Sequence, residues 1–244
     1  MNFRDIKNSV AVITGASSGI GQATARALVE EGVHVVLVAR SRDKLEALAS
    51  ELGERAVVKA ADVADVDAVA RVFGEVKQAF GGLDLLFNNA GVGYHNAFEH
   101  STRDEWTATI DANLYGVLNC TQQAIPLLRG RHGAMISTVS SVGGRYGIAG
   151  WSVYNATKFA VVGFHDALRK ELGEEGIRVS LVEPGAVHTN WGHNVPADQM
   201  KQRRDALDAL HAEDIANALV YAFAQPAHVN IQEALIMPTR QISP

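Results

Sequence analysis

The segment YNATK contains a tyrosine and a lysine whose spacing could support proton transfer. In a helix, Tyr154 and Lys158 would lie one turn apart on the same face. A cation about 4 Å from a phenolate, at an effective dielectric constant near 20, stabilises it by about 4 kcal/mol, which moves the pKa of a tyrosine from about 10 toward 7. Such a phenol can donate and accept a proton. The same spacing is also typical of polar pairs on a solvated helix face, so the rest of the chain must decide between the two interpretations.

The segment TGASSGIG places Gly15, Gly19 and Gly21 between an expected strand over 10–14 and an expected helix over 20–31. Glycines allow a sharp turn and a close approach of backbone to ligand, and the first N–H groups of a helix attract anions. At the first strand-to-helix turn of an alternating fold, this arrangement favours a site for a dinucleotide pyrophosphate. The spacing is wider than G-x-G-x-x-G, and a tight turn without a ligand is the alternative.

The residues after the second expected strand bear on the choice between NAD and NADP. An Asp or Glu about 20 residues after the glycine loop favours NAD. Here Ala39 stands where the acid is expected, Arg40 follows, and Arg42 is nearby. A guanidinium without an adjacent carboxylate suits the 2′-phosphate of NADP. We therefore expect NADP, with NAD as the alternative in which the arginines are simply exposed at a strand end.

Strands and helices are expected to alternate along the chain. Apolar runs predict strands over 10–14, 33–39, 56–60, 83–87, 134–139, 177–182 and 234–237. Helical periodicity predicts helices over 20–31, 43–52, 65–80, 102–128 and 152–175. Alternating strands and helices form βαβ units, and the right-handed crossovers of such units give a parallel sheet with helices on both faces. The expected fold is therefore one doubly wound α/β domain over 1–244, with a Rossmann-type parallel sheet of about seven strands. Residues 186–212 are expected to form a substrate-side loop and helix outside this pattern.

Composition narrows the class of protein. The chain has 244 residues, 47% of them hydrophobic, with a net charge of −5, which argues against nucleic acid or an anionic membrane as a partner. A single cysteine, Cys120, excludes an intrachain disulfide and suits a reducing compartment, so a cytoplasmic location is expected. The nine histidines form no H-x-x-x-H pair or Cys/His cluster, so no metal site is expected.

Several segments together resemble the classical short-chain dehydrogenases/reductases, and the resemblance covers nearly the whole chain. They are TGASSGIG (14–21), ADV (61–63), NNAG (88–91), DANLYG (111–116), STVSSVGG (137–144) before YNATK (154–158), and EPGAVHT (183–189). The C-terminal stretch also looks like the branch that contains 3-hydroxy-acid dehydrogenases and clavulanate-type aldehyde reductases.

The resemblance implies an NADP-dependent oxidoreductase that transfers a hydride between nicotinamide and a carbonyl or alcohol substrate. It implies four catalytic residues: Asn113, Ser141, Tyr154 and Lys158. The family serine stands thirteen residues before the tyrosine, which selects Ser141 over Ser140. In the family, the tyrosine exchanges the proton, the lysine also binds the nicotinamide ribose, the serine binds the substrate oxygen and the asparagine supports a water chain to solvent.

The expected ligand contacts follow the same segments. The expected cofactor-binding residues are Gly15, Ser17, Ser18, Gly19, Ile20, Gly21, Arg40, Asp62, Val63, Asn89, Ala90, Gly91, Tyr154, Lys158, Pro184, Gly185, Val187 and Thr189. The expected substrate-binding residues are Ser141, Tyr154, His95 and Trp191. His95 is on a loop at the cofactor-facing edge of the sheet and Trp191 could wall a pocket; an exposed loop histidine and ordinary aromatic packing are the alternatives.

Two further interpretations stay open. One is a dinucleotide-sensing regulator that has lost catalysis; the presence of all four expected catalytic residues counts against it. The other is an NAD-preferring dehydrogenase of the same fold. Apolar residues around much of the helix over 152–172 favour a subunit interface, and a homotetramer or homodimer is expected. The substrate itself is not predicted, because specificity lies in loops.

Overall fold

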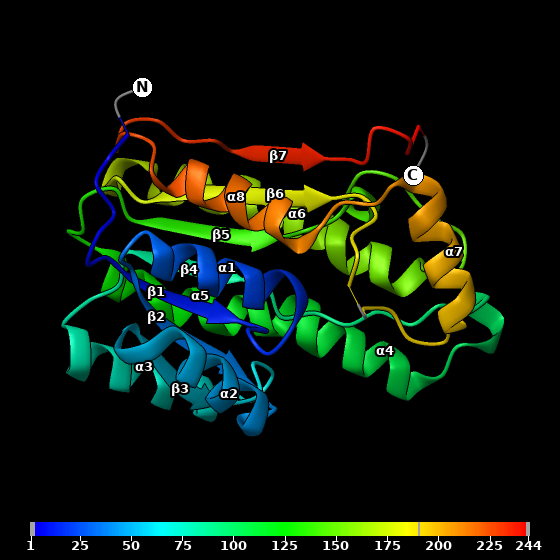
Figure 1. Ribbon diagram of the computed structural model, residues 1–244, viewed down its shortest axis with the longest axis horizontal. Coiled ribbons are helices and arrows are strands. Elements are labelled where there is room, and N and C mark those ends of the chain that lie inside the picture. The colour runs from blue at the N-terminus through cyan, green and yellow to red at the C-terminus, as the bar shows by residue number, and fades with distance from the viewer. Residues whose placement is uncertain (1–2, 190, 243–244) are drawn as a thin grey trace.

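The computed structural model describes residues 3–189 and 191–242. Within these residues, seven strands form one parallel sheet in the order β3-β2-β1-β4-β5-β6-β7 (Figure 1). The strands are β1 (Val10–Thr14), β2 (His34–Ala39), β3 (Ala56–Ala60), β4 (Leu85–Asn88), β5 (Met135–Val139), β6 (Arg178–Pro184) and β7 (Glu233–Ile236). The strand order reverses between β1 and β4. In an open parallel sheet, the crevice beyond the carboxyl ends of the strands at such a point is where ligands bind.

Helices cover both faces of the sheet (Figure 1). They are α1 (Gly19–Glu30), α2 (Arg42–Leu52), α3 (Val66–Phe80), α4 (Arg103–Ile110), α5 (Gly116–Leu128), α6 (Ser152–Leu172), α7 (Ala197–Leu207) and α8 (Ala212–Phe223). Helices α1, α2 and α8 pack on one face, and α3, α5 and α6 on the other. Helix α7 lies at one end of the molecule, beyond the carboxyl ends of the strands.

Each face of the sheet has its own hydrophobic core. On β1, Val10 and Val12 pack toward α3, α5 and α6, whereas Ala11 and Ile13 pack toward α1, α2 and α8. Because alternate residues of a strand face opposite sides, a strand buried on both faces is apolar throughout. This is why short, continuous apolar runs predict the strands of this chain.

Local side-chain chemistry sets several helix ends. The Asp65 side chain accepts hydrogen bonds from the backbone of Asp67 and Ala68 at the start of α3, and Gly81 ends that helix in the left-handed conformation. At the start of α4, Thr102 and Glu105 form a reciprocal capping box. These caps fix where each helix begins or ends relative to the sheet.

The doubly wound α/β fold predicted from the sequence is confirmed, with strand ends that differ by one or two residues. The single helix expected over 102–128 is instead α4 and α5 joined by a π-helical segment, Asp111–Tyr115. The expected excursion over 186–212 contains a loop and α7. No helix within the described residues is long and apolar enough to span a membrane.

Candidate active site

A cleft of about 770 Å³ lies at the carboxyl ends of the central strands. The glycine loop, the residues that follow β2, β3, β4, β5 and β6, and one face of α7 line it. This volume is within the range of small-molecule and cofactor sites. The cleft therefore brings together segments that are far apart in sequence.

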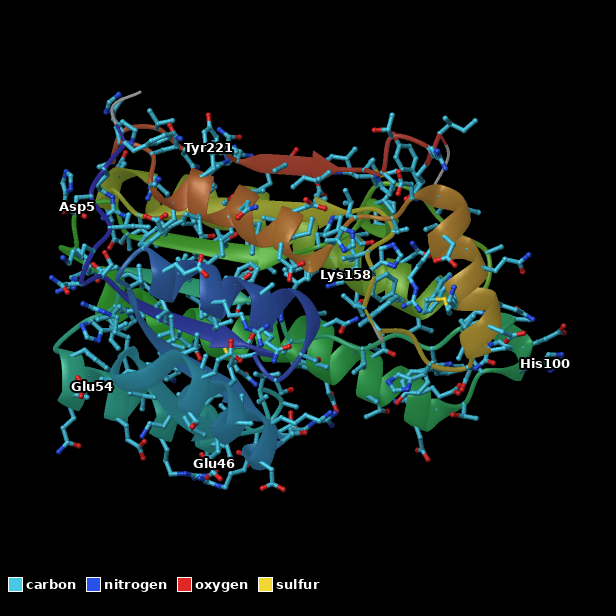
Figure 2. All side chains as sticks on the ribbon, viewed as in Figure 1. Asp5, Glu46, Glu54, His100, Lys158 and Tyr221 are labelled. Atoms are coloured by element: carbon cyan, nitrogen blue, oxygen red, sulfur yellow. The ribbon has the colours of Figure 1, made fainter. Side chains whose placement is uncertain are left out.

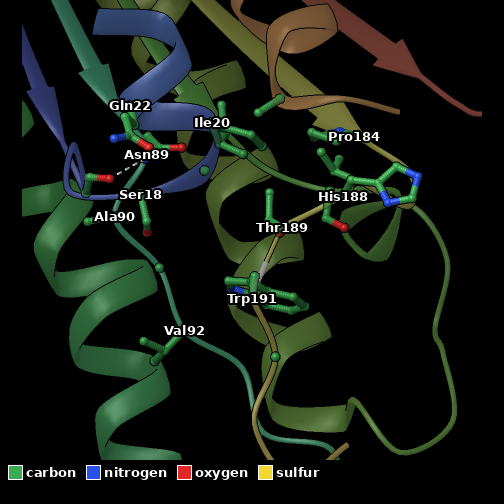
Figure 3. Close-up of a pocket in the computed structure, with 18 of the residues that line it drawn as sticks. Ser18, Ile20, Gln22, Asn89, Ala90, Val92, Pro184, His188, Thr189 and Trp191 are labelled. Atoms are coloured by element: carbon green, nitrogen blue, oxygen red, sulfur yellow. Dashed lines mark hydrogen bonds between the residues drawn. The ribbon is translucent and has the colours of Figure 1, made fainter. Parts of the chain in front are cut away.

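The glycine loop is held tightly against the residues that follow β4. Gly15 has φ +63°, and a Cβ there would lie 2.8 Å from the Ala90 Cα, so a side chain is excluded. The Asn89 side chain donates hydrogen bonds to the carbonyl oxygens of Thr14 (3.0 Å) and Gly15 (3.2 Å), and a dashed line marks such a contact beside Asn89 in Figure 3. Asn89 thus shapes the loop as well as lining the cleft.

The N-terminus of α1 is a ready anion site. Ser18 is the N-cap, but its side chain makes no capping hydrogen bond, and the first turn contains no acidic residue. Ser17, Ser18, Gly19 and Ile20 all line the cleft. The first backbone N–H groups of a helix have no partner within the helix and carry the positive end of its dipole. This end of α1 therefore fits a pyrophosphate.

The residues after β2 and β3 form a different part of the cleft. Arg40, whose side chain is 74% exposed, places Nη1 3.9 Å from Oδ2 of Asp62. Val63 is buried, and its carbonyl oxygen accepts a hydrogen bond from Asn119. This region offers a guanidinium, a carboxylate and an apolar surface, which suits the adenosine end of a dinucleotide.

Tyr154 and Lys158 project from the same face of α6 into the cleft. Lys158 is 5% exposed, its Nζ lies 5.6 Å from the centroid of the Tyr154 ring, and it donates a 2.7 Å hydrogen bond to the carbonyl oxygen of Val139. In Figure 2, Lys158 lies inside the molecule, whereas the other labelled side chains lie at its rim. Lys158 is therefore buried and Tyr154 is half-buried where it lines the cleft, so the pair is not part of a solvated helix face.

Burial dominates the acid–base behaviour of this pair. It raises the pKa of Tyr154 to about 12, although a hydrogen bond with Ser141 acts in the opposite direction. It lowers the pKa of Lys158 to about 8. The expectation that the pKa of Tyr154 falls toward 7 is wrong for the protein without a bound cofactor, because burial removes water from the phenolate. At neutral pH, Tyr154 is a protonated phenol.

The two serines after β5 have different surroundings. The Ser141 hydroxyl lies near the Tyr154 phenol, where it opposes the rise of the Tyr154 pKa, and it accepts a hydrogen bond from the backbone N–H of Gly143 (3.0 Å). The Ser140 hydroxyl is buried and donates to the carbonyl oxygen of Lys158 in α6. Ser141 is therefore the serine that touches the phenol, and Ser140 packs beneath the helix.

Asn113 lies in the π-helical segment and does not line the cleft. Its amide oxygen accepts from the Val92 N–H and its amide nitrogen donates to the Val92 carbonyl, both at 2.8 Å, and also to the Thr157 hydroxyl at 3.1 Å. A Cβ on Gly91 would lie 3.0 Å from this amide oxygen and 3.8 Å from the Lys158 nitrogen. Asn113 thus ties the segment after β4 to α6 close to Lys158.

Aromatic rings form the wall beside Tyr154. Trp191 stacks on Trp151 with ring centroids 5.2 Å apart, and its centroid lies 4.7 Å from that of Tyr154. Trp191 lines the cleft as expected for a substrate-side residue, but His95 does not. The His95 ring packs against Trp151 and so lies behind this wall, while His193 reaches the cleft instead.

The cleft contains most of the residues singled out from the sequence. Of the expected cofactor-binding residues, Gly21 alone does not line it. A Cβ on Gly21 would meet Gly15 and Asn89, so this glycine permits close packing behind the loop. Among residues 3–189 and 191–242, no group of three or more His, Cys, Asp or Glu side chains could hold a metal ion.

The sequence did not indicate four of the residues that line the cleft, one in the C-terminal segment and three in α7. The side chain of Gln241 lines it and accepts a hydrogen bond from the Ala186 N–H (2.8 Å). Met200, Arg203 and Arg204 of α7 also line it. No motif marks these residues, because their approach depends on how α7 and the C-terminal segment fold back over the sheet.

A buried ion pair links the serine turn to the strand end opposite it. Arg145 donates to both carboxylate oxygens of Glu183 at 2.8–3.0 Å and also pairs with Glu233 of β7. Glu183 is 1% exposed and directly precedes Pro184. The pair therefore connects the turn after Ser141 to the 184–189 segment of the cleft.

Comparison with known proteins gives a consistent result. A family model described as short chain dehydrogenase matches residues 9–200. The chain is 38% identical to a glycine betaine reductase of Emericella nidulans, over 96% of this chain but only 19% of the length of that protein. It is 36% identical to an uncharacterized oxidoreductase of Staphylococcus aureus, over 96% of this chain and 98% of that protein.

Solved structures with the same arrangement contain nicotinamide dinucleotides. A closed form of serine dehydrogenase complexed with NADP+ matches with a TM-score of 0.92 and 28% identity, over 96% of each chain. An alcohol dehydrogenase from Thermococcus sibiricus complexed with 5-hydroxy-NADP matches with a TM-score of 0.87 and 29% identity, over 98% of this chain and all of that one. A 3-ketoacyl-(acyl-carrier-protein) reductase from Brucella melitensis complexed with NADH gives 0.86 and 29%, over 97% of this chain and all of that one.

Proposed function

The chain belongs to the short chain dehydrogenase family and is an oxidoreductase with a nicotinamide dinucleotide cofactor; on this premise we propose that it interconverts a small carbonyl compound and its alcohol, with Tyr154 as general acid and base. The observation that carries the proposal is the enclosed group of Tyr154, Lys158 and Ser141, which shares one cleft with the anion site at the start of α1. When bound, the nicotinamide supplies or accepts the hydride.

The residues of the chain then have separate tasks. The protonated phenol of Tyr154 donates its proton to the carbonyl oxygen during reduction, and the phenolate accepts one during oxidation. Ser141 donates a hydrogen bond to the same oxygen, which stabilises the charge that develops on it. Lys158, beside the ring, favours the phenolate and binds the nicotinamide ribose. Asn113 acts through others: it holds the Val92 backbone and Thr157 so that Lys158 keeps its place.

We propose NADP(H) as the preferred cofactor. Two features support this: Ala39 offers no carboxylate to a ribose diol, and the exposed Arg40 lines the cleft next to it. A guanidinium can hold a phosphate by two charge-assisted hydrogen bonds. The Asp62 carboxylate competes for the same guanidinium, but at 3.9 Å and in solvent that attraction is weak. Neighbouring structures contain NADP+ in one case and NADH in another, so NAD(H) is the alternative.

A dinucleotide sensor without catalysis is the competing function. It needs the anion site at α1, but it has no use for a proton donor enclosed beside an aromatic wall. The two are separated by a spectrophotometric screen at 340 nm, with NADPH and NADH, of aldehydes, ketones, 3-oxoacyl thioesters, serine, other hydroxy acids, and the aldehyde related to glycine betaine. Turnover of any member supports the enzyme. Tight cofactor binding with no turnover across the panel supports the sensor.

A further inference from the structure

We propose that Arg203 and Arg204 of α7 bind the pyrophosphate of the dinucleotide, so that the cofactor is held between the N-terminus of α1 and the last turn of α7. This inference rests on the proposed dinucleotide site and adds a second, cationic side to it. Both arginines line the cleft.

One face of α7 is turned toward the cleft. Met200, Arg203 and Arg204 are spaced i, i+3 and i+4, which puts them on a single helical face, and all three line the cleft. The methyl group of Met200 lies 3.8 Å from where a Cβ on Gly192 would be, next to the tryptophan wall. The arginines are one turn further along the helix, so α7 carries its apolar residue at the substrate end and its cations beyond it.

The cationic turn of α7 lies next to the glycine loop. The Arg204 side chain donates a hydrogen bond to the carbonyl oxygen of Thr189. The Thr189 Cγ2 is 3.1 Å from where a Cβ on Gly19 would be, and Gly19 is the first residue of α1. In Figure 3, Ser18 and Thr189 border the same space. A single residue therefore separates Arg204 from the helix end that fits a pyrophosphate.

Within the described residues, no carboxylate neutralises these two arginines, although Arg204 donates a hydrogen bond to the Thr189 carbonyl oxygen. The other two arginines that line the cleft each pair with a carboxylate: Arg26 with Glu51 and Arg40 with Asp62. Neither Arg203 nor Arg204 pairs with a described carboxylate, and the Arg204 Nε is buried without a hydrogen-bond partner there. Two such guanidinium groups match the two negative charges of a pyrophosphate.

A third cation on α7, Lys201, offers a control variant for the test of Arg203 and Arg204. Lys201 is a cation of the same helix, but it pairs with Asp205, one turn further along, and does not line the cleft. Lys201→Gln therefore removes one positive charge from α7 without removing a group that faces the cleft.

The test measures binding of ADP-ribose, which carries the pyrophosphate without a nicotinamide, and of adenosine, which carries no phosphate, by isothermal titration calorimetry. We expect Arg203→Gln and Arg204→Gln each to weaken ADP-ribose binding by about tenfold and to make it less salt-dependent, because a charge-assisted contact is lost. Adenosine binding should stay unchanged in both variants, and Lys201→Gln should bind ADP-ribose as the unmodified protein does. Arg203→Lys should recover part of the loss.

Four results would overturn the inference. If both arginine variants bound ADP-ribose as tightly as the unmodified protein does, the two arginines would not contact the pyrophosphate. Equal losses for adenosine and ADP-ribose would show a structural effect of α7, and an equal loss in Lys201→Gln would show a general effect of charge. If the unmodified protein failed to bind ADP-ribose at all, the proposed function would fall together with this inference.

Discussion

The Lys158 ammonium lies 5.6 Å from the centre of the Tyr154 ring and donates a hydrogen bond to the carbonyl oxygen of Val139. The lysine makes no described hydrogen bond to the phenol and lies over the face of its ring, at a distance where a cation and an aromatic ring attract each other. Burial holds the pKa of Tyr154 at about 12 and that of Lys158 at about 8. This arrangement keeps the phenol protonated at neutral pH, which suits a group that donates a proton to a carbonyl oxygen.

The pH dependence of the two reaction directions should differ. Because Tyr154 stays protonated well above neutral pH, kcat/KM for carbonyl reduction should be level between about pH 6 and 8. For alcohol oxidation, kcat/KM should rise with pH over the same range, because the phenolate fraction grows. Initial rates in both directions across this range check the prediction. A reduction rate that falls with a midpoint near pH 7 would mean that the phenol titrates there.

Replacing the buried lysine should change how stability depends on pH. The pKa of Lys158 is lowered from 10.5 to about 8, so between these values the unfolded chain binds a proton that the folded chain does not, and stability rises with pH there. Below pH 8 the folded protein bears the full cost of charging this lysine, about 3 kcal/mol. Lys158→Met should therefore be more stable than the unmodified protein at pH 7 and lack this rise.

Urea unfolding at pH 7, 8, 9 and 10 measures this effect. The loss of the hydrogen bond to Val139 offsets part of the gain, by about 1 kcal/mol. If Lys158→Met kept the same increase in stability between pH 8 and 10, another group would be responsible. Turnover in this variant should fall with cofactor affinity, because the lysine serves both the phenol and the ribose.

The buried pair of Arg145 and Glu183 should be worth more than a surface ion pair. Arg145→Met leaves the Glu183 carboxylate, which is 1% exposed, without its main partner, and should destabilise the protein by about 3 kcal/mol. Adding Glu183→Gln removes the unpaired charge and should restore part of the loss. A double-mutant cycle by urea unfolding gives the coupling. If Arg145→Met lowered the free energy of unfolding by no more than about 1 kcal/mol, the pair would contribute no more than an exposed ion pair does.

Cofactor preference should depend on Arg40. We expect NADP(H) to exceed NAD(H) in kcat/KM by about tenfold or more, which corresponds to one charge-assisted contact. Arg40→Gln should lower this ratio by lowering the value for NADP(H) alone, and Ala39→Asp added to it should reverse the preference. Arg42→Gln is the matched control, because Arg42 pairs with Glu46 and does not line the cleft. Equal or better performance with NAD(H) in the unmodified protein would contradict the assignment.

The sequence predicts the fold well because its signals are local. Apolar runs mark strands buried on both faces, and residues such as Asp65 and Gly81 mark helix ends. The π-helical segment is not predictable in this way, since it accompanies contacts of Asn113 with Val92 and Thr157, which are distant in sequence. A motif shows which residue types are present but not how the chain packs around them.

Because motifs do not report packing, some expectations about the site differ from the structure. His95 follows the expected strand, yet its ring packs against Trp151 and does not line the cleft. The pKa of Tyr154 depends on burial, which residue spacing does not report. The arginines of α7 reach the cleft only because the chain returns over the sheet after β6. The resemblance to the short-chain dehydrogenases/reductases was enough to find the catalytic candidates, whereas their electrostatics required the three-dimensional arrangement.

The central claim is that Tyr154 carries the proton transfer, and Tyr154→Phe tests it most directly. The variant keeps the ring that packs against Trp191 and loses only the hydroxyl. Steady-state turnover of a substrate identified in the screen, and NADPH binding by fluorescence titration, should be measured on the same preparation. We predict that turnover falls by about a thousandfold or more, as expected for loss of a positioned general acid, while the NADPH dissociation constant stays within a few-fold. Retention of most of the unmodified rate would contradict this role for Tyr154.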